Sequence, residues 1–355
     1  MTNNSEKLIN AVQPKRARVN RIVLIVLIVS LIFLFFASFF LGRYPITAKE
    51  VMGIFYSKTF LNNIWPIDAF WTSTQEAVTM NIRLPRIILA CLVGCCLSTA
   101  GATYQGVFQN PMASPDILGA TNGAAFGAAL ALLNGQRNFV VMISAFFFSI
   151  LTVVLVNLIA SRAKGSKILG LVLSGIMVSS LFSAGTSYIK LVADPNDVLP
   201  EITYWLMGSL AGATMKEIGY AIIPMIIGTI PIFLLRWRIN ILSMGDEEAR
   251  TMGVNAPRVR FIMIISSTLI TAASVSISGV IGWVGLVVPH LARRLVGNNY
   301  KYLIPSSMLF GSIFLLLVDN VSRNLWETEI PIGILTAVIG APFSIYLIIK
   351  RGDYE

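Results

Sequence analysis

Residues 22–41 read IVLIVLIVSLIFLFFASFFL, an uninterrupted apolar run that decides the class of fold. One helical crossing of a bilayer needs about 20 apolar residues. No small-residue cleavage site follows this run, so it is interpreted as a retained membrane helix rather than a removed signal peptide. Across the chain 55% of the residues are hydrophobic and 12% are charged, against about 25% charged in soluble domains. The sequence therefore predicts an all-α polytopic membrane protein.

Apolar runs bounded by charges, glycine and proline predict about ten transmembrane helices. The expected spans cover residues 22–41, 87–104, 117–133, 139–160, 168–192, 218–235, 261–279, 281–296, 302–320 and 332–349. We expect residues 22–350 to form a single transmembrane domain, with tails at 1–21 and 351–355.

The basic residues indicate the orientation of the chain. Its formal net charge is +10, but the 27 Lys and Arg residues stand at the ends of apolar runs along the whole sequence. With ten spans and an internal N-terminus, they favour the inner segments by about two to one. This distribution predicts membrane topology with both termini cytoplasmic, and we expect lipid rather than nucleic acid as the contact.

Few residues suggest catalysis or metal binding. Cys91, Cys95 and Cys96 share one apolar segment, where packing is the favoured interpretation. His290 is the only histidine, and a metal site normally needs three or four ligands. We expect it to anchor the end of the short eighth span. No H-E-x-x-H or G-x-S-x-G pattern supports an intramembrane enzyme, so we predict no catalytic residue and no metal site.

Other transporter classes remain as alternatives. A secondary transporter would need acids within the spans, and Glu217 and Asp319 near span ends are almost all that the sequence offers. Asp319 is predicted to pair with Arg323, one helical turn later. Residue type alone does not exclude a channel.

Polar amides follow the second predicted span. Gln105, Gln109, Asn110 and Asn122 stand in an apolar context, where amides are costly unless they find partners or line a wet cavity. They predict a translocation path, with capping of a helix end as the alternative, chiefly for Asn110.

A second polar stretch, at about residues 240–256, lies between two predicted spans on the side that the basic residues mark as cytoplasmic. Ser243 followed by Asp246 and Glu247 predicts a helix start, and Gly253 predicts its end. This short helix could be a simple surface connection.

The sequence resembles the FecCD-type permease family of ABC importers, which serves iron-siderophore, haem and vitamin B12 uptake. The resemblance rests on Arg83-Leu-Pro-Arg86, Gln109-Asn-Pro-Met-Ala-Ser-Pro115, Leu118-Gly-Ala-Thr-Asn-Gly123, Gly285-Leu-Val-Val-Pro-His290 and the segment from Pro331 to Pro342. These matches run in order from about residue 80 to the C-terminus.

The resemblance implies a type II ABC importer permease fold and several partners. These are a second permease subunit, identical or paralogous, two cytoplasmic ATPase subunits, and an extracytoplasmic substrate-binding protein. The chain holds no G-x-x-x-x-G-K-[ST] phosphate loop, so we expect no cofactor on this chain, with ATP and magnesium on the partner ATPase. The location would be a prokaryotic plasma membrane.

The resemblance also assigns residues. Gly245, Glu248, Ala249 and Gly253 match the coupling helix that contacts the ATPase. Arg83, Arg86 and Arg323 match points where acidic residues of the binding protein dock, although arginines at a span end could also simply reach toward lipid head groups. The expected substrate is an iron-siderophore complex, because most relatives serve that class, with cobalamin or haem as alternatives.

Overall fold

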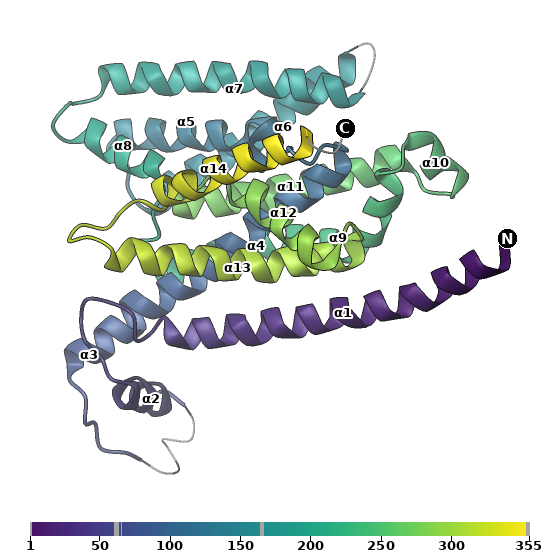
Figure 1. Ribbon diagram of the computed structural model, residues 1–355. Coiled ribbons are helices and arrows are strands. Elements are labelled where there is room, and N and C mark those ends of the chain that lie inside the picture. Colours follow the sequence, from purple (N-terminus) through teal and green to yellow (C-terminus); the bar gives the residue numbers. More distant parts are fainter. Residues whose placement is uncertain (1, 60–63, 65, 164–166, 353–355) are drawn as a thin grey trace.

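The computed structural model describes residues 2–59, 64, 66–163 and 167–352. All regular elements in these ranges are helical, and the long helices run along one common direction (Figure 1). In chain order they are α1 (Thr2–Ala37), α2 (Ala48–Ser57), α3 (Ser73–Ala77), η2 (Val78–Arg83), α4 (Leu84–Val107), η3 (Pro115–Leu118), α5 (Ala120–Leu133), α6 (Phe139–Arg162), α7 (Lys167–Val192), α8 (Val198–Met207), α9 (Met215–Leu242), α10 (Asp246–Thr251), α11 (Ala256–Ser278), α12 (Val284–Val296), α13 (Tyr300–Asn324) and α14 (Ile332–Gly352).

Each of the ten predicted spans coincides with a helix. Seven helices in the described residues are long and apolar enough to cross a membrane, namely the segments of α1, α4, α6, α7, α9, α11 and α13. Helices α5 and α14 are apolar but shorter. Helix α12 has 13 residues and ends in Arg293 and Arg294, as expected for the short eighth span. The prediction of an all-helical membrane fold is confirmed.

The ends of the chain differ from the predicted boundaries. Helix α1 begins at Thr2, so the expected tail and the first span form one helix that projects beyond the bundle (Figure 1). At the other end α14 continues to Gly352, and residues 353–355 of the expected tail lie outside the described residues.

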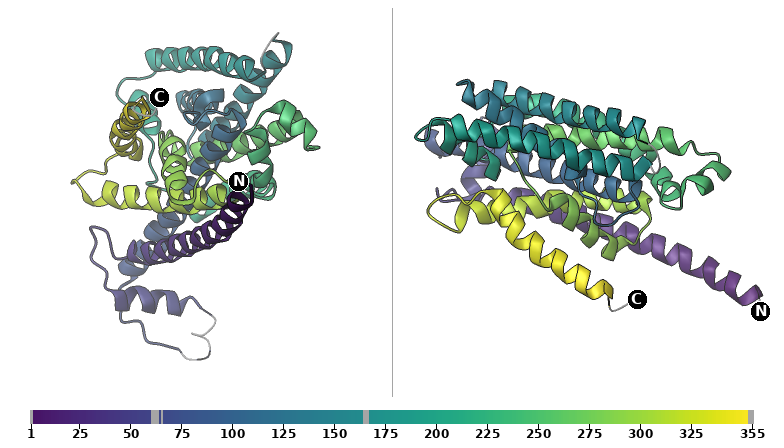
Figure 2. Two further views of the ribbon diagram at one scale, coloured as in Figure 1. Left: turned by 45° about the vertical axis from the view of Figure 1, so that its right-hand side comes forward. Right: turned by 90° about the horizontal axis from the view of Figure 1, so that it is seen from above.

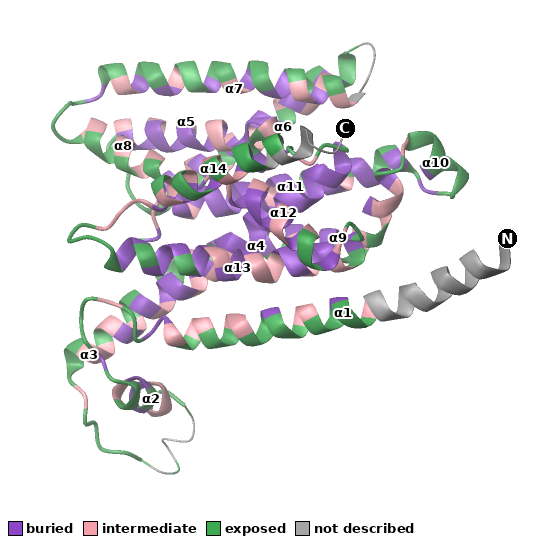
Figure 3. Cartoon of the chain, in the orientation of Figure 1, coloured by how far each residue is buried: buried purple, intermediate pink, exposed green. Residues whose placement is uncertain are grey.

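Three helices form the centre of the bundle. The apolar windows of α4, α11 and α13 are 78%, 72% and 61% buried, whereas that of α1 is 11% buried. Figure 3 shows this contrast between the central and outer helices, and Figure 2 shows the outer position of α1 and α7. Helices α9, α11, α12 and α13 all pack against α4. The outer helices therefore offer their apolar faces to lipid.

Glycines allow the backbones around α4 to approach closely. A Cβ atom at Gly101 would lie 1.8 Å from the carbonyl oxygen of Gly285 on α12, and one at Gly94 would lie 2.2 Å from that of Gly311 on α13. Without a hydrophobic driving force between helices in lipid, this close packing is a main source of helix association. The two contacts fix α12 and α13 on α4.

Helix α11 connects the centre to a junction at one end of the bundle. Thr268 and Tyr104 of α4 share a hydroxyl hydrogen bond of 3.0 Å. At the end of α11, Ser209 donates its backbone N–H to the carbonyl of Ser278 at 2.8 Å, and Ile332 donates to the carbonyl of Gly208 at 2.9 Å. The starts of the α8–α9 link and of α14 are thereby attached to α11.

The glycine contact predicts opposite effects for two matched substitutions. Gly101→Ala forces α4 and α12 apart, and overpacking of this kind costs about 1–3 kcal/mol. Gly219→Ala lies in α9 where a Cβ meets no atom within 4 Å, so better helix propensity should stabilise the protein by up to about 1 kcal/mol. Thermal unfolding in detergent should show a lower melting temperature for the first variant only. Equal effects of the two substitutions would contradict the packing role of Gly101.

Candidate functional site

The predicted site residues gather at the two opposite ends of the bundle. Helix α10 and the C-terminal end of α4 lie at one end, which also carries the N-terminus (Figure 1). The N-terminal end of α4 and the C-terminal end of α13, with their arginines, lie at the other (Figure 1). In the following, these are called the α10 end and the arginine end.

Helix α10 is attached to α11 by an ion pair. Asp246, its first residue, accepts two hydrogen bonds from the guanidinium of Arg260, at 2.6 and 3.1 Å. Arg260 is buried, whereas the Asp246 side chain is about half exposed. Bidentate pairs between arginine and carboxylate fix geometry as well as adding energy. This pair holds the short helix rigidly against the long one.

The four predicted coupling residues occupy different positions on α10. Ala249 is fully buried and packs inward, while Glu248 is exposed. Gly245 (φ 130°) and Gly253 (φ 74°) flank the helix in conformations that L side chains rarely adopt. Exposed Met244 and Met252 extend the outer surface.

The predicted start of this helix is wrong by two residues. Ser243 is the C-cap of α9, and Gly245 is the N-cap of α10. Ser243 donates its hydroxyl to the carbonyl of Asn240, so it is engaged in the preceding helix and does not cap the next one. The predicted end is confirmed, because Gly253 follows the last turn in the left-handed region.

The predicted path residues occupy three different settings. Gln105 is buried, and the structure gives no hydrogen bond to either polar atom of its amide. Gln109 is exposed, has φ 52°, and donates from its side chain to the carbonyl of Leu242 at 2.7 Å. Asn110 accepts a hydrogen bond from the backbone N–H of Met112 at 2.9 Å. The last two thus stabilise the turn after α4; the Asn110 side chain caps no helix, since Phe108 is the C-cap of α4 and Ser114 the N-cap of η3.

Asn122 lines an open groove of about 520 Å³ between α5 and α7. Its polar lining consists of hydroxyl, amide and carboxylate groups, with no cation; it comprises Asp116, Asn122, Ser179, Ser180 and Ser183. The hydroxyl of Thr121 donates to the Asp116 carboxylate. Asp116 was not among the predicted path residues, although it stands directly between the motifs Gln109–Pro115 and Leu118–Gly123.

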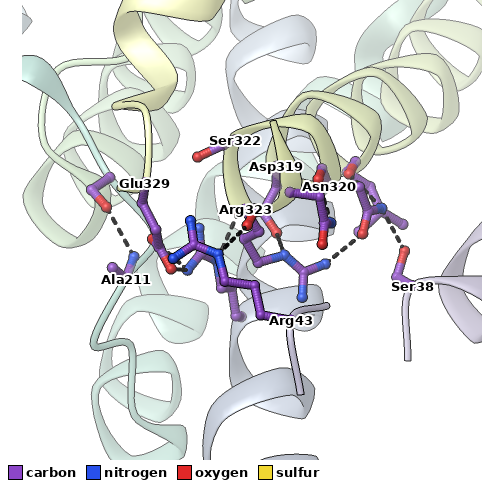
Figure 4. A network of polar contacts seen from close by, with 12 residues as sticks. Ser38, Arg43, Ala211, Asp319, Asn320, Ser322, Arg323 and Glu329 are labelled. Atoms are coloured by element: carbon purple, nitrogen blue, oxygen red, sulfur yellow. Dashed lines mark hydrogen bonds and ion pairs between the residues drawn. The ribbon is translucent and has the colours of Figure 1, made fainter. Parts of the chain in front are cut away.

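A cluster of buried charges occupies the arginine end. Arg86 contacts Asp319 of α13 and Glu329 of the α13–α14 link, each at 2.8 Å. Asp319 also pairs with Arg323 at 3.1 Å, which confirms the predicted pair one turn apart. Figure 4 shows Asp319, Arg323 and Glu329 turned toward one another. Two arginines around a fully buried carboxylate compensate the charge that membrane burial would otherwise make costly.

Backbone carbonyls accept hydrogen bonds from two further arginines at this end. Arg83 donates to the carbonyls of Phe39 and Tyr44. Arg43 donates to the carbonyls of Arg323, Trp326 and Glu327. The guanidinium groups thus fasten the loops after α1 and α13 to the bundle.

We expected the three predicted docking arginines to be exposed on the surface, but the structure buries them. Arg83, Arg86 and Arg323 are 3%, 4% and 8% exposed. A partner could reach them only by exchanging these internal contacts, so docking stays a prediction. The sequence did not reveal Glu329 as a partner of Arg86, because they stand 243 positions apart.

His290 lies at the α12–α14 contact. Its ring is edge-on to Phe343 of α14, with ring centroids 6.3 Å apart. His290 is the seventh of the 13 residues of α12, so it lies in the middle of the short helix and not at its end, where we expected it.

Comparisons with known proteins agree on one family. A sequence model of the FecCD transport family matches residues 30–350. The molybdate import permease MolB of Haemophilus influenzae is 39% identical over 314 residues, covering 88% of this chain and 91% of the relative. An iron chelatin transport system permease of Helicobacter pylori (strain ATCC 700392 / 26695) is 41% identical over 278 residues, covering 78% of this chain and 84% of the relative.

A solved structure shows the same architecture. A metal-chelate type ABC transporter in an inward-facing conformation has a TM-score of 0.82 and 37% identity, covering 92% of this chain and 99% of that chain. The fold, the family model and the two relatives all span most of the sequence. The chain therefore belongs to the FecCD transport family, as a membrane-spanning permease of an ABC importer.

Proposed function

We propose that this permease imports an iron-siderophore complex, driven by ATP that separate subunits hydrolyse. Family membership implies a partner ATPase and a substrate-binding protein, and it makes the chain a multi-pass protein of the inner membrane. The observation that carries the coupling to ATP is α10, a short polar helix fixed to a long apolar one.

The two faces of α10 suit a mechanical coupling element. Its inner face is fixed by buried Ala249 and by the pair of Asp246 with Arg260. Its outer face presents Met244, Glu248 and Met252 to a partner. A small rigid helix of this kind transmits a domain movement as a lever. We propose that the α10 end, with both termini, lies in the cytoplasm against the ATPase.

The arginine end is then the docking face for the binding protein. We propose that carboxylates of the binding protein compete there with Asp319 and Glu329 for Arg86 and Arg323. Arg83 would support this surface by holding the loop after α1. The full importer would contain two permease subunits and two ATPases. Complementary charges of this kind set the on-rate and register of docking.

The side chains that line the groove at Asn122 help to choose between substrate classes. We propose that it faces the translocation path, together with the deeper Gln105. Asp116 and the absence of a lining cation disfavour an oxyanion, because like charges placed together are costly. The iron chelatin relative and a ferric citrate permease of Bacillus subtilis support an iron chelate.

Molybdate is the second candidate, because the MolB relative aligns with 88% of the chain. Other relatives are named for cobalamin and hemin, so these substrates belong in the same test.

Uptake into proteoliposomes tests the proposed function. The permease, its genomic-neighbour ATPase and its binding protein should accumulate radiolabelled iron-siderophore only with ATP, because only the ATPase supplies the energy. Molybdate, cobalamin and hemin serve as parallel substrates. Exclusive uptake of one of these would replace the proposed substrate, and uptake without the ATPase would contradict the importer class.

Asp246→Asn should weaken coupling. Removing the carboxylate leaves the buried Arg260 without its charged partner, and a charge-assisted hydrogen bond is worth about 1.5 kcal/mol, or about tenfold in an equilibrium. We expect about tenfold less uptake per ATP hydrolysed. Glu247→Gln is the matched control, since none of the ion pairs found in the described residues involves Glu247. Normal uptake in Asp246→Asn would show that α10 does not need this attachment.

Two substitutions around Arg86 should change docking in opposite directions. Glu329→Gln removes the more exposed competitor for the guanidinium, so the affinity for the binding protein should rise several-fold, and more at low salt. Arg86→Gln should lower it. Glu327→Gln, in the same loop, is the control. Surface plasmon resonance at two ionic strengths measures the affinities; if neither variant differs from the control, Arg86 is not a docking residue.

A further inference from the structure

A lateral arm projects from the arginine end of the bundle. We use this name for the described residues of the range 42–72, which include α2. Helix α2 lies on the far side of α1 from α13, and in Figure 1 it is seen nearly end-on while α1 and α13 run lengthwise. Figure 2 shows it side-on after rotation. Its axis is therefore steeply inclined to the spans, and it extends sideways rather than along them.

The position of α2 along the bundle direction indicates whether lipid or a soluble protein covers the arm. Along the bundle direction α2 lies no further out than the ends of α7 and α13 (Figure 1). A soluble partner docked on the bundle would stand beyond those ends. A helix at their level, outside the outermost span, lies instead where the membrane surface meets the protein.

Contacts within the arm hold it in a defined shape. Thr47 and Glu50 form a reciprocal cap at the start of α2, and hydrogen bonds from Thr47 lower the pKa of the Glu50 carboxyl. Phe55 of α2 packs edge-on to Phe39 at 5.1 Å. A Cβ at Gly53 would lie only 2.6 Å from the Phe70 ring. The helix is thus packed against its own loop and the end of α1.

Polar contacts with Glu76 of α3 reinforce this packing. Lys58 pairs with Glu76 of α3 at 2.6 Å, and the Trp71 indole donates to the same carboxylate at 3.2 Å. The C-terminal end of α2 and the Trp71 end of the arm are therefore both attached to α3.

The exposed surface of the arm combines large apolar side chains with charged ones, among them Lys49, Lys58 and Asp68. Large apolar side chains are exposed along it and at its base, namely Phe40, Leu41, Tyr44, Met52, Ile64, Ile67 and Phe70. They continue the exposed face of α1, where Phe33 and Phe36 point outward. Lys49 lies over the Phe70 ring at 5.0 Å. Tyrosine is enriched at the level of the lipid head groups, and a lysine beside apolar surface can extend its charge toward them.

We propose that the lateral arm is a membrane-interface anchor, with α2 lying among the phospholipid head groups of the leaflet next to the arginine end. Its exposed apolar side chains enter the acyl boundary, while Lys49 reaches lipid phosphate. Exposed apolar side chains are found both on α1 and on the arm, and α2 lies at the level of the span ends; both observations favour lipid over a protein partner as the occupant. The proposal does not depend on the substrate or on ATP coupling.

Site-directed spin labelling in lipid nanodiscs tests the anchor. A label at Met52→Cys should be relaxed by oxygen several-fold more than by a water-soluble nickel chelate. The control is Asn196→Cys, exposed in the α7–α8 link at the same end, where the nickel chelate should dominate. The parent protein, with Cys91, Cys95 and Cys96 on α4, measures the labelling background.

Further measurements separate lipid from protein as the occupant. Fluorescence of a dye at position 52 should be quenched by lipids brominated near the head group and should not change when the binding protein is added. A label at position 52 that is as accessible to nickel as the one at position 196, or that becomes protected only with the binding protein, would overturn the proposal. The labelled Met52→Cys permease should keep normal uptake, which shows that the label reports on a folded protein.

Discussion

Close backbone contact around α4 is the constraint on which the rest of the structure depends. Gly94 and Gly101 leave no room for a side chain against α13 and α12. Some polar side chains of the central helices bond within their own helix: Ser274 and Ser278 of α11 donate to carbonyls one turn earlier. The core is thus held by shape and by satisfied backbone groups, since lipid offers no water to replace them.

The positions of the spans could be predicted because lipid imposes a long apolar signal on each one. Short elements carry no such signal. Helix α2 begins at a capping box, Thr47 with Glu50, that is visible in the sequence but lies between spans, where we predicted only a link. The helix start at Ser243 was misplaced because serine and glycine both suit an N-cap, and only the observed backbone shows which residue serves.

The sequence could predict which charged residues belong to the candidate site, but not which of them form ion pairs with one another. Arg86 and Arg323 stand near span ends, and only the fold brings Glu329 to Arg86 and Asp319 between both arginines. Asp246 and Arg260 stand only 14 positions apart, yet helical periodicity gives no reason to pair them across a turn. Ion pairs between elements depend on the tertiary arrangement, whereas the Asp319–Arg323 pair within one helix follows from spacing alone.

Helix α11 gives the two membrane surfaces a shared mechanical axis. It receives Arg260 with its attached α10 at one end, meets Tyr104 of α4 midway, and holds Ser209 at the other end. The hydrogen bond from Ile332 to the carbonyl of Gly208 then attaches the start of α14 to the same region. A single rod of 23 residues therefore touches the surface helix, the packed centre and the opposite rim, so no side of this bundle can shift far while the others keep their present contacts.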